Sequence, residues 1–130
     1  MPWGEFAAVG GGAATGAWMR WWLGIVLNPV FPTVPLGTLA ANLVGGLIMG
    51  VAMELMSRFA SMPAEVRLLL TTGFLGGLTT FSTFSGEVTS LLLRRELWWG
   101  AVAVGAHVIG SIALTVLGML IARALFAWGA

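Results

Sequence analysis

Long apolar stretches dominate this chain, and the polar segments between them are short. Four stretches, at residues 3–27, 35–55, 68–93 and 97–125, each reach the roughly 20 apolar residues that cross a bilayer. They are separated by a proline-rich turn at 28–35, a polar hinge at 57–67 and a charged break at 94–96. The pattern predicts an all-α integral membrane protein with four transmembrane helices, forming one domain over residues 1–130.

The composition supports a location in the lipid bilayer. Hydrophobic residues make up 58% of the 130 positions and charged residues only 8%, with a mean hydropathy of +0.97. This is too little charge to cover a water-soluble globule. Six basic and five acidic residues leave no basic face for nucleic acid. With no Cys, no Tyr and a single His, we do not expect an enzyme.

The first stretch is expected to remain in the protein as a span. A cleaved signal peptide would begin with a basic region, whereas the early charge here is Glu5. Four spans place both termini on one side of the membrane. We expect the plasma membrane, which is the inner membrane of a bacterium.

Arginine does not favour either orientation in the membrane. The termini side carries Arg58, Arg67 and Arg123, and the other side carries Arg20, Arg94 and Arg95. Because Lys and Arg bias sets orientation, an even division leaves it undetermined. Either the balance is accidental and another feature decides, or the protein inserts both ways and pairs with its own inverted copy.

Small residues at helical spacing indicate close helix packing. Gly12 and Gly16, and Gly46 and Gly50, form two GxxxG pairs. Such pairs let helix backbones approach each other in lipid. We interpret them as structural.

Polar residues within the spans form two lines along helix faces. Thr38 and Asn42 are four apart on the second span, and His107, Ser111 and Thr115 continue the same spacing on the fourth. Polar groups are costly in hydrocarbon, so these residues either bond the helices together or line a polar path.

The third span has an unusual centre, residues 73–85. Gly76 and Gly77 are expected to break the helix, and the Ser and Thr residues that follow compete for backbone hydrogen bonds. A break at membrane depth is tolerated where the freed groups are buried or face water, and its carbonyls can bind a cation. The alternatives are a bound ion near the midplane or a Ser/Thr-rich helix merely bent by its neighbours.

Two aromatic residues and one carboxylate complete the candidates. Phe81 and Phe84 are three apart and share a helix face. They make ordinary lipid or core contacts, or they present positive ring edges to a small anion. Glu87 is either a buried hydrogen-bond acceptor or part of an ion path.

Taken together, the motifs at residues 10–20, 37–45 and 73–85 resemble the CrcB/Fluc family of fluoride channels. The resemblance covers nearly the whole chain. It implies a fluoride-selective channel that passively exports cytoplasmic fluoride. It also implies an inverted homodimer with two pores and a structural, non-transported Na+ on its axis.

The resemblance also implies roles for individual residues. It assigns the paired pore phenylalanines to Phe81 and Phe84, and the structural Na+ to the carbonyls of Gly76 and Thr79. Arg20 would lie near the aqueous vestibule. The polar pore positions are Thr38, Asn42, Ser82, Ser85, His107, Ser111 and Thr115. In the fourth span this chain departs from some relatives, which carry hydroxyls where it has Ala103 and His107.

Two other functions remain open. A small multidrug exporter also has four spans, but it exchanges protons for organic cations through a carboxylate midway along the first span, where this chain has none. A membrane assembly factor without transport activity is the third possibility, if the polar residues only hold helices together.

Overall fold

The computed structural model describes residues 3–129 and is helical almost throughout, with no strand among those residues. This confirms the predicted all-α fold. Met1, Pro2 and Ala130, which belong to the predicted domain, lie outside the described residues. The elements are α1 (Trp3–Leu27), η1 (Asn28–Val30), α2 (Leu36–Arg58), α3 (Ala64–Leu68), η2 (Leu69–Leu75), α4 (Gly76–Leu78), α5 (Phe81–Leu93) and α6 (Leu97–Trp128).

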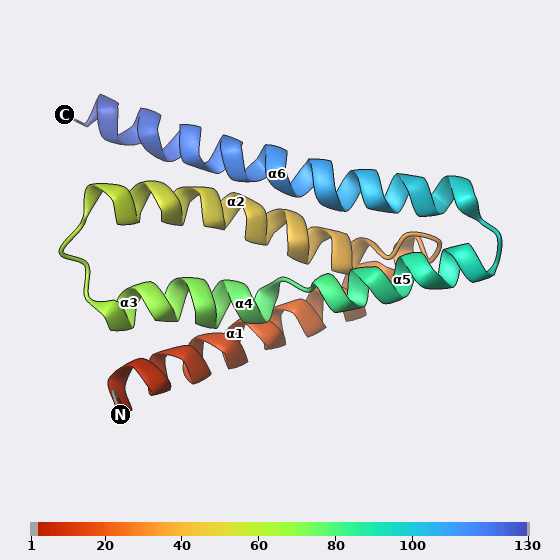
Figure 1. Cartoon of the computed structure of the whole chain (residues 1–130), viewed down its shortest axis with the longest axis horizontal. Helices are drawn as coiled ribbons and strands as arrows, with labels where there is room; N and C mark the ends of the chain where they lie inside the picture. The colour runs from red at the N-terminus through yellow and green to blue at the C-terminus, as the bar shows by residue number, and fades with distance from the viewer. Residues whose placement is uncertain (1–2, 130) are drawn as a thin grey trace.

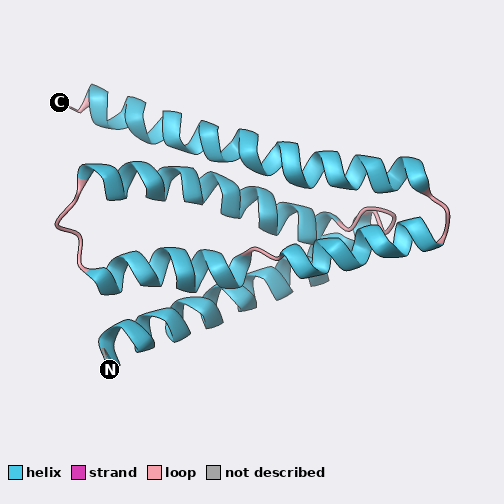
Figure 2. Cartoon of the chain, viewed as in Figure 1, coloured by secondary structure: helices cyan, strands magenta, loops and turns pink. Residues whose placement is uncertain are grey.

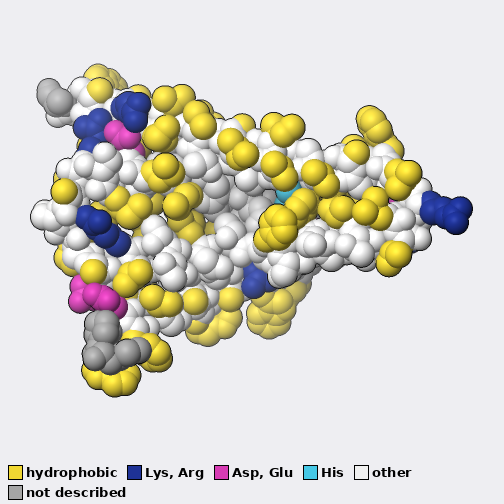
Figure 3. Space-filling model, viewed as in Figure 1, with side chains coloured by type: hydrophobic (Ala, Val, Ile, Leu, Met, Phe, Trp, Pro, Cys, Tyr) yellow, Lys and Arg dark blue, Asp and Glu magenta, His cyan; other side chains and the backbone are white. Residues whose placement is uncertain are grey.

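The elements form a bundle of long, roughly antiparallel rods (Figure 1). The chain begins and ends at the same end of the bundle. The elements α3, η2, α4 and α5 together make one rod, which is called the third rod below. α2 packs mainly against α6, and α1 packs mainly against η2 and α4. Hydrophobic side chains lie along the whole visible face, while Arg and Glu gather mainly towards its ends (Figure 3).

Within the described residues, α2 and α6 are each long and apolar enough to cross a membrane as a single helix. The third predicted span does not form one helix, because it is divided into shorter elements. α1 has the length, but it is rich in Gly and Trp, which are only weakly apolar.

The two predicted glycine pairs lie where helix backbones meet, which confirms their structural interpretation. A Cβ on Gly12 or Gly16 would collide with the backbone of the third rod, at Leu69 or Phe74. A Cβ on Gly46 would lie 2.8 Å from the carbonyl oxygen of Ser111. Hydrogen in place of a side chain therefore sets the distance from α1 to the third rod and from α2 to α6.

The predicted helix break at Gly76 and Gly77 is wrong in its position. Both glycines are helical, and the helix instead gives way at Thr79 (ψ 153°) and Thr80 (φ −149°, ψ 114°), which are extended. Figure 2 shows this interruption as a short loop between α4 and α5. Gly77 serves packing, since a Cβ at this position would collide with the backbone of Ala13 in α1.

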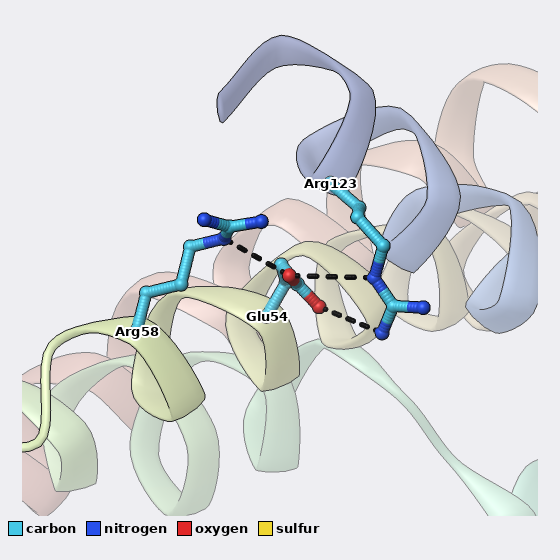
Figure 4. A network of polar contacts seen from close by, with 3 residues as sticks. All are labelled: Glu54, Arg58 and Arg123. Carbon is cyan, nitrogen blue, oxygen red and sulfur yellow. Dashed lines mark hydrogen bonds and ion pairs between the residues drawn. The ribbon is translucent and has the colours of Figure 1, made fainter. Parts of the chain in front are cut away.

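An ion-pair cluster joins α2 to α6 at the predicted end of the second span. α2 continues to Arg58, so part of the predicted hinge is helical. Glu54 is 6% exposed and accepts from Arg58 Nε at 3.0 Å and from Arg123 Nη2 at 3.2 Å. Figure 4 shows both guanidinium groups converging on this carboxylate. Glu54 was not singled out from sequence, because its partner Arg123 is 69 residues away.

Candidate functional site

A groove of about 660 Å³ opens between α2, α6 and the third rod. Its walls bring together residues that are far apart in sequence. Eight of the predicted site residues line it: Asn42, Gly76, Thr79, Phe81, Phe84, His107, Ser111 and Thr115.

The remaining predicted residues lie elsewhere. Arg20 and Thr38 line a second cavity of about 310 Å³, together with Asn28. Ser82 and Ser85 are exposed on α5 and line neither of these two cavities in the described part of the chain. Ser82 Oγ lies 3.3 Å from Thr80 Oγ1.

The two predicted phenylalanines contact each other but differ in exposure. Their ring centroids are 5.5 Å apart with an interplanar angle of 73°, an edge-to-face pair. Phe81 is 77% exposed, whereas Phe84 is 6% exposed and packs against the His107 ring at 4.5 Å. The groove is therefore lined by one exposed aromatic ring, that of Phe81, and by one buried ring, that of Phe84.

Asn42 binds the peptide at the helix interruption. Thr80 N donates to Asn42 Oδ1 at 2.8 Å, and Asn42 Nδ2 donates to the Thr80 carbonyl at 3.1 Å. The same Nδ2 is 3.0 Å from His107 Nδ1. A single side chain in the wall of the groove thus joins α2 to the third rod and to α6.

Thr80 also begins α5, a role that sequence reasoning missed. Its hydroxyl accepts from Thr83 N at 3.1 Å, which is the standard N-cap bond. The available signal was a Thr directly before a helix-forming run. It was obscured because Thr79, Ser82 and Thr83 offer similar hydroxyls nearby.

The interruption frees backbone carbonyls from helical hydrogen bonding. In a continuous helix, Gly76 O would pair with Thr80 N and Thr79 O with Thr83 N. Those two N–H groups instead donate to Asn42 Oδ1 and Thr80 Oγ1. The carbonyl of Gly77 accepts from Arg20 Nε at 3.0 Å. The carbonyls of Gly76 and Thr79 are thereby left as hard oxygen donors, which fit a monovalent cation.

The second cavity is shaped by bonds at the start of α2. Asn28 Oδ1 accepts from Gly37 N at 2.8 Å and from Thr38 N at 3.2 Å, so this residue caps the helix. Thr38 Oγ1 donates to Glu87 Oε2 at 2.6 Å. Glu87 is thus a hydrogen-bond acceptor that joins α5 to α2. Asn28 was missed from sequence because it precedes α2 by several residues, across a proline-rich turn.

Comparison with known protein families gives a match over most of the chain. The family model described as "CrcB-like protein, Camphor Resistance (CrcB)" matches residues 7–119. That range includes every predicted site residue and both cavities.

Similar proteins cover most of the chain. A protein of Nitrosospira multiformis named "Fluoride-specific ion channel FluC" is 56% identical over 113 residues, which are 87% of this chain and 88% of the relative. One of Ralstonia pickettii with the same name is 56% identical over 118 residues, 91% of this chain and 94% of the relative. A third, from Aromatoleum aromaticum, is 55% identical over 113 residues, 87% of this chain and 86% of the relative. With this identity and with the family match over residues 7–119, the chain belongs to the CrcB-like family of membrane proteins.

Proposed function

We propose that this chain forms a fluoride-selective ion channel that lets cytoplasmic fluoride leave the cell passively. The observation that carries the proposal is the identity of more than half of the aligned residues with relatives named as fluoride-specific ion channels. The groove also supports the proposal, because aromatic and polar side chains line it. An ion channel needs no catalytic group, and we assign no enzymatic activity.

The pore wall is assigned to the residues of the groove. Phe81 and Phe84 line the groove. Their ring edges carry partial positive charge and would attract an anion without binding it permanently. Ser111 and Thr115 supply hydroxyls from α6. Weak, neutral ligands of this kind suit conduction, since an ion must be both dehydrated and released.

The second cavity is assigned to the entrance of the pore. Arg20 would concentrate anions there, and Thr38 lines the same space. Ser82 and Ser85 lie on the exposed side of α5 and would border the path once a second copy covers that side.

The working unit is proposed to be an inverted homodimer with two pores. The groove of one chain is open, and it exposes Thr72 and Gly76 beside the interruption. Polar backbone and hydroxyl groups are costly against lipid, so a second copy over this side would shield them. The even distribution of Arg favours a copy inserted the other way round.

A structural Na+ is proposed at the centre of that dimer. The carbonyls of Gly76 and Thr79 from each subunit would hold it, because they are freed from helical pairing. The cation would supply a fixed positive charge that draws four carbonyl dipoles together. It is not transported.

The proposed location is the plasma membrane, the inner membrane of a bacterium. The direction of flow follows from acid chemistry. Fluoride enters an acid-exposed cell as neutral HF, dissociates inside and then leaves down its electrochemical gradient.

Fluoride efflux from liposomes tests the function. Purified protein in vesicles loaded with potassium fluoride should release fluoride when valinomycin is added, and chloride-loaded vesicles should release little chloride. The variant with both Phe81→Ile and Phe84→Ile should lose fluoride flux. Phe126→Ile is the matched control, since Phe126 forms a similar edge-to-face pair with Phe59 away from the groove.

Each failure has a distinct meaning. Absence of fluoride flux through the natural protein would refute the channel. Unchanged flux in the double variant would refute the pore assignment. Proton-coupled uptake of an organic cation would support a small multidrug exporter instead.

The dimer and its cation are tested separately. The chain contains no Cys, so single introduced cysteines report neighbours directly. Cross-links only between parallel copies would contradict the inverted pair. Replacing Na+ throughout by a large organic cation should weaken the dimer, measured by size in detergent, and equal dimer content in both salts would contradict the Na+ site.

A further inference from the structure

The ion-pair cluster of Glu54, Arg58 and Arg123 carries more positive than negative charge. Two guanidinium groups share a single carboxylate, so one positive charge is left over. The side chain of Glu54 is 8% exposed, whereas those of Arg58 and Arg123 are 37% and 56% exposed. The negative charge is therefore buried between the helices, and the excess positive charge faces outward.

Both arginines keep hydrogen-bond donors that the cluster does not use. Arg58 donates to Glu54 through Nε, and Arg123 does so through Nε and Nη2. Nη1 and Nη2 of Arg58 and Nη1 of Arg123 bond to no group among residues 3–129. Figure 4 shows these nitrogens directed away from the carboxylate. A guanidinium group with free N–H donors is well suited to bind phosphate oxygens in pairs.

The length of α6 places Arg123 at the level of lipid headgroups. Trp98, near the start of α6, is 73% exposed, and exposed Trp is typical of the membrane–water interface. Arg123 follows 25 positions later on the same helix. This is about 38 Å along the axis, or about 35 Å across the bilayer at a usual tilt of about 20°. Since the hydrocarbon core is about 30 Å thick, Arg123 lies in the opposite headgroup layer.

An apolar surface continues from Arg123 into the membrane. Val116 and Leu120 precede it by seven and three positions, so the three residues share one face of α6. Val116 is 45% exposed and Leu120 is 50% exposed, and neither lines the groove. A molecule with its phosphate at Arg123 could lay an acyl chain along this face. This arrangement fits a phospholipid better than a free anion.

We propose that the cluster binds the phosphate group of an anionic phospholipid. Arg58 and Arg123 donate to the phosphate oxygens, and Glu54 holds the two guanidinium groups together. Basic sites between transmembrane helices at headgroup depth are suited to such lipids. None of the three residues lines the groove, so this site is separate from the proposed pore and does not depend on which ion the chain conducts.

Native mass spectrometry of the purified protein tests the site. The protein in neutral detergent is titrated with phosphatidylglycerol or with phosphatidylcholine, which has no net charge. We expect one saturable phosphatidylglycerol molecule per chain and weaker, non-saturating binding of phosphatidylcholine. Glycerol phosphate, which has the phosphate but no acyl chain, should not compete. Equal binding of the two lipids, or effective competition by glycerol phosphate, would overturn the proposal.

Removal of the two arginines should weaken this binding selectively. The double variant Arg58→Gln, Arg123→Gln should bind phosphatidylglycerol about 25-fold more weakly, at about fivefold for each arginine near the membrane surface. Arg67→Gln is the matched control. Arg67 lies on α3 at the same end of the bundle and donates to the Ala60 carbonyl instead. Equal affinities of the double variant and the control would overturn the site.

Glu54→Gln separates lipid binding from stability. The amide keeps a hydrogen-bond acceptor for the arginines but removes the charge that repels phosphate. We therefore expect phosphatidylglycerol to bind this variant more tightly, by up to about fivefold, although the protein without lipid melts at a lower temperature. Unchanged or weaker binding would contradict the proposal. This test retains both arginines, so it remains decisive if the double variant does not fold.

Discussion

Asn42 on α2 binds both polar atoms of the Thr80 peptide, accepting from its N–H at 2.8 Å and donating to its carbonyl at 3.1 Å. The first bond replaces the one that Thr80 N–H would make to Gly76 O in a continuous helix, and the second adds a donor to the carbonyl at which α5 begins. An amide side chain therefore stabilises a non-helical peptide at a depth where water is scarce. The interruption between α4 and α5 depends on a residue 38 positions earlier in the chain.

Removing this side chain should destabilise the fold. Asn42→Ala leaves Thr80 N–H unpaired and removes one donor from the Thr80 carbonyl, and we expect a loss of about 2 kcal/mol. Asn42→Asp keeps the bond from Thr80 N and should lose less. Thermal unfolding in detergent, followed by Trp fluorescence, should give the highest melting temperature for the natural protein, a lower one for Asn42→Asp and the lowest for Asn42→Ala. Equal stability of the Ala variant and the natural protein would contradict the role of this contact.

The N-cap of α5 can be tested by its hydroxyl. Thr80→Ala removes the acceptor for Thr83 N and should cost about 1 kcal/mol of stability. Thr80→Ser keeps the hydroxyl and should behave like the natural protein. Hydrogen exchange at the Thr83 amide is the local measurement, and it should accelerate in the Ala variant alone. If both variants exchange alike, the hydroxyl is not the cap.

The ion-pair cluster should hold the ends of α2 and α6 together. Glu54→Gln removes the charge that both Arg58 and Arg123 share, leaving two guanidinium groups side by side. We expect a lower melting temperature and faster hydrogen exchange at the end of α6. Glu65→Gln, an exposed carboxylate on α3, is the control and should change little. Equal effects of the two substitutions would show that the cluster contributes no specific stability.

Close packing of α2 and α6 should not tolerate even one methyl group. A Cβ on Gly50 would collide with the Thr115 backbone, so Gly50→Ala should destabilise by about 1–3 kcal/mol through helix displacement. Gly10 has open space at the corresponding position, and Gly10→Ala should be neutral or slightly stabilising because Ala favours helix. Thermal unfolding of both variants provides the comparison. A stable Gly50→Ala protein would contradict the packing argument.

Arg20 should act at the helix interruption as well as in the cavity it lines. Arg20→Gln weakens the charged bond to the Gly77 carbonyl, so stability should fall by about 1–2 kcal/mol. Arg94→Gln, at the exposed turn before α6, removes the same charge without such a bond to the third rod. If Arg20 also concentrates anions, fluoride flux should fall more for Arg20→Gln than for Arg94→Gln, and the difference should shrink at high salt. Equal fluoride flux through the two variants at low salt would contradict the anion-concentrating role of Arg20 and leave only its structural bond to Gly77.

The sequence by itself predicted the all-α fold and the family. Apolar stretches of bilayer length recur four times, and hydrophobic pattern and length depend only on neighbouring residues. The GxxxG pairs were also readable, because small residues at that spacing have few uses other than close contact. Polar or aromatic positions within apolar segments could also be selected from sequence. In the groove these positions are Phe81, Phe84, His107, Ser111 and Thr115.

The position of the interruption was decided by tertiary structure. Local preference pointed to Gly76 and Gly77, but α1 packs against Gly77 and keeps it helical. The break moved to Thr79 and Thr80, where Asn42 from α2 supplies replacement hydrogen bonds. A helix ends where its backbone groups find other partners, and those partners come from distant segments.

The division of the polar residues between two cavities also depends on the fold. Thr38 and Asn42 share one helix face by sequence, yet Thr38 bonds to Glu87 in one cavity and Asn42 lines the other. The spacing of residues determines which side of a helix they occupy. Which hydrogen bonds they make is decided by the neighbours that packing brings within reach.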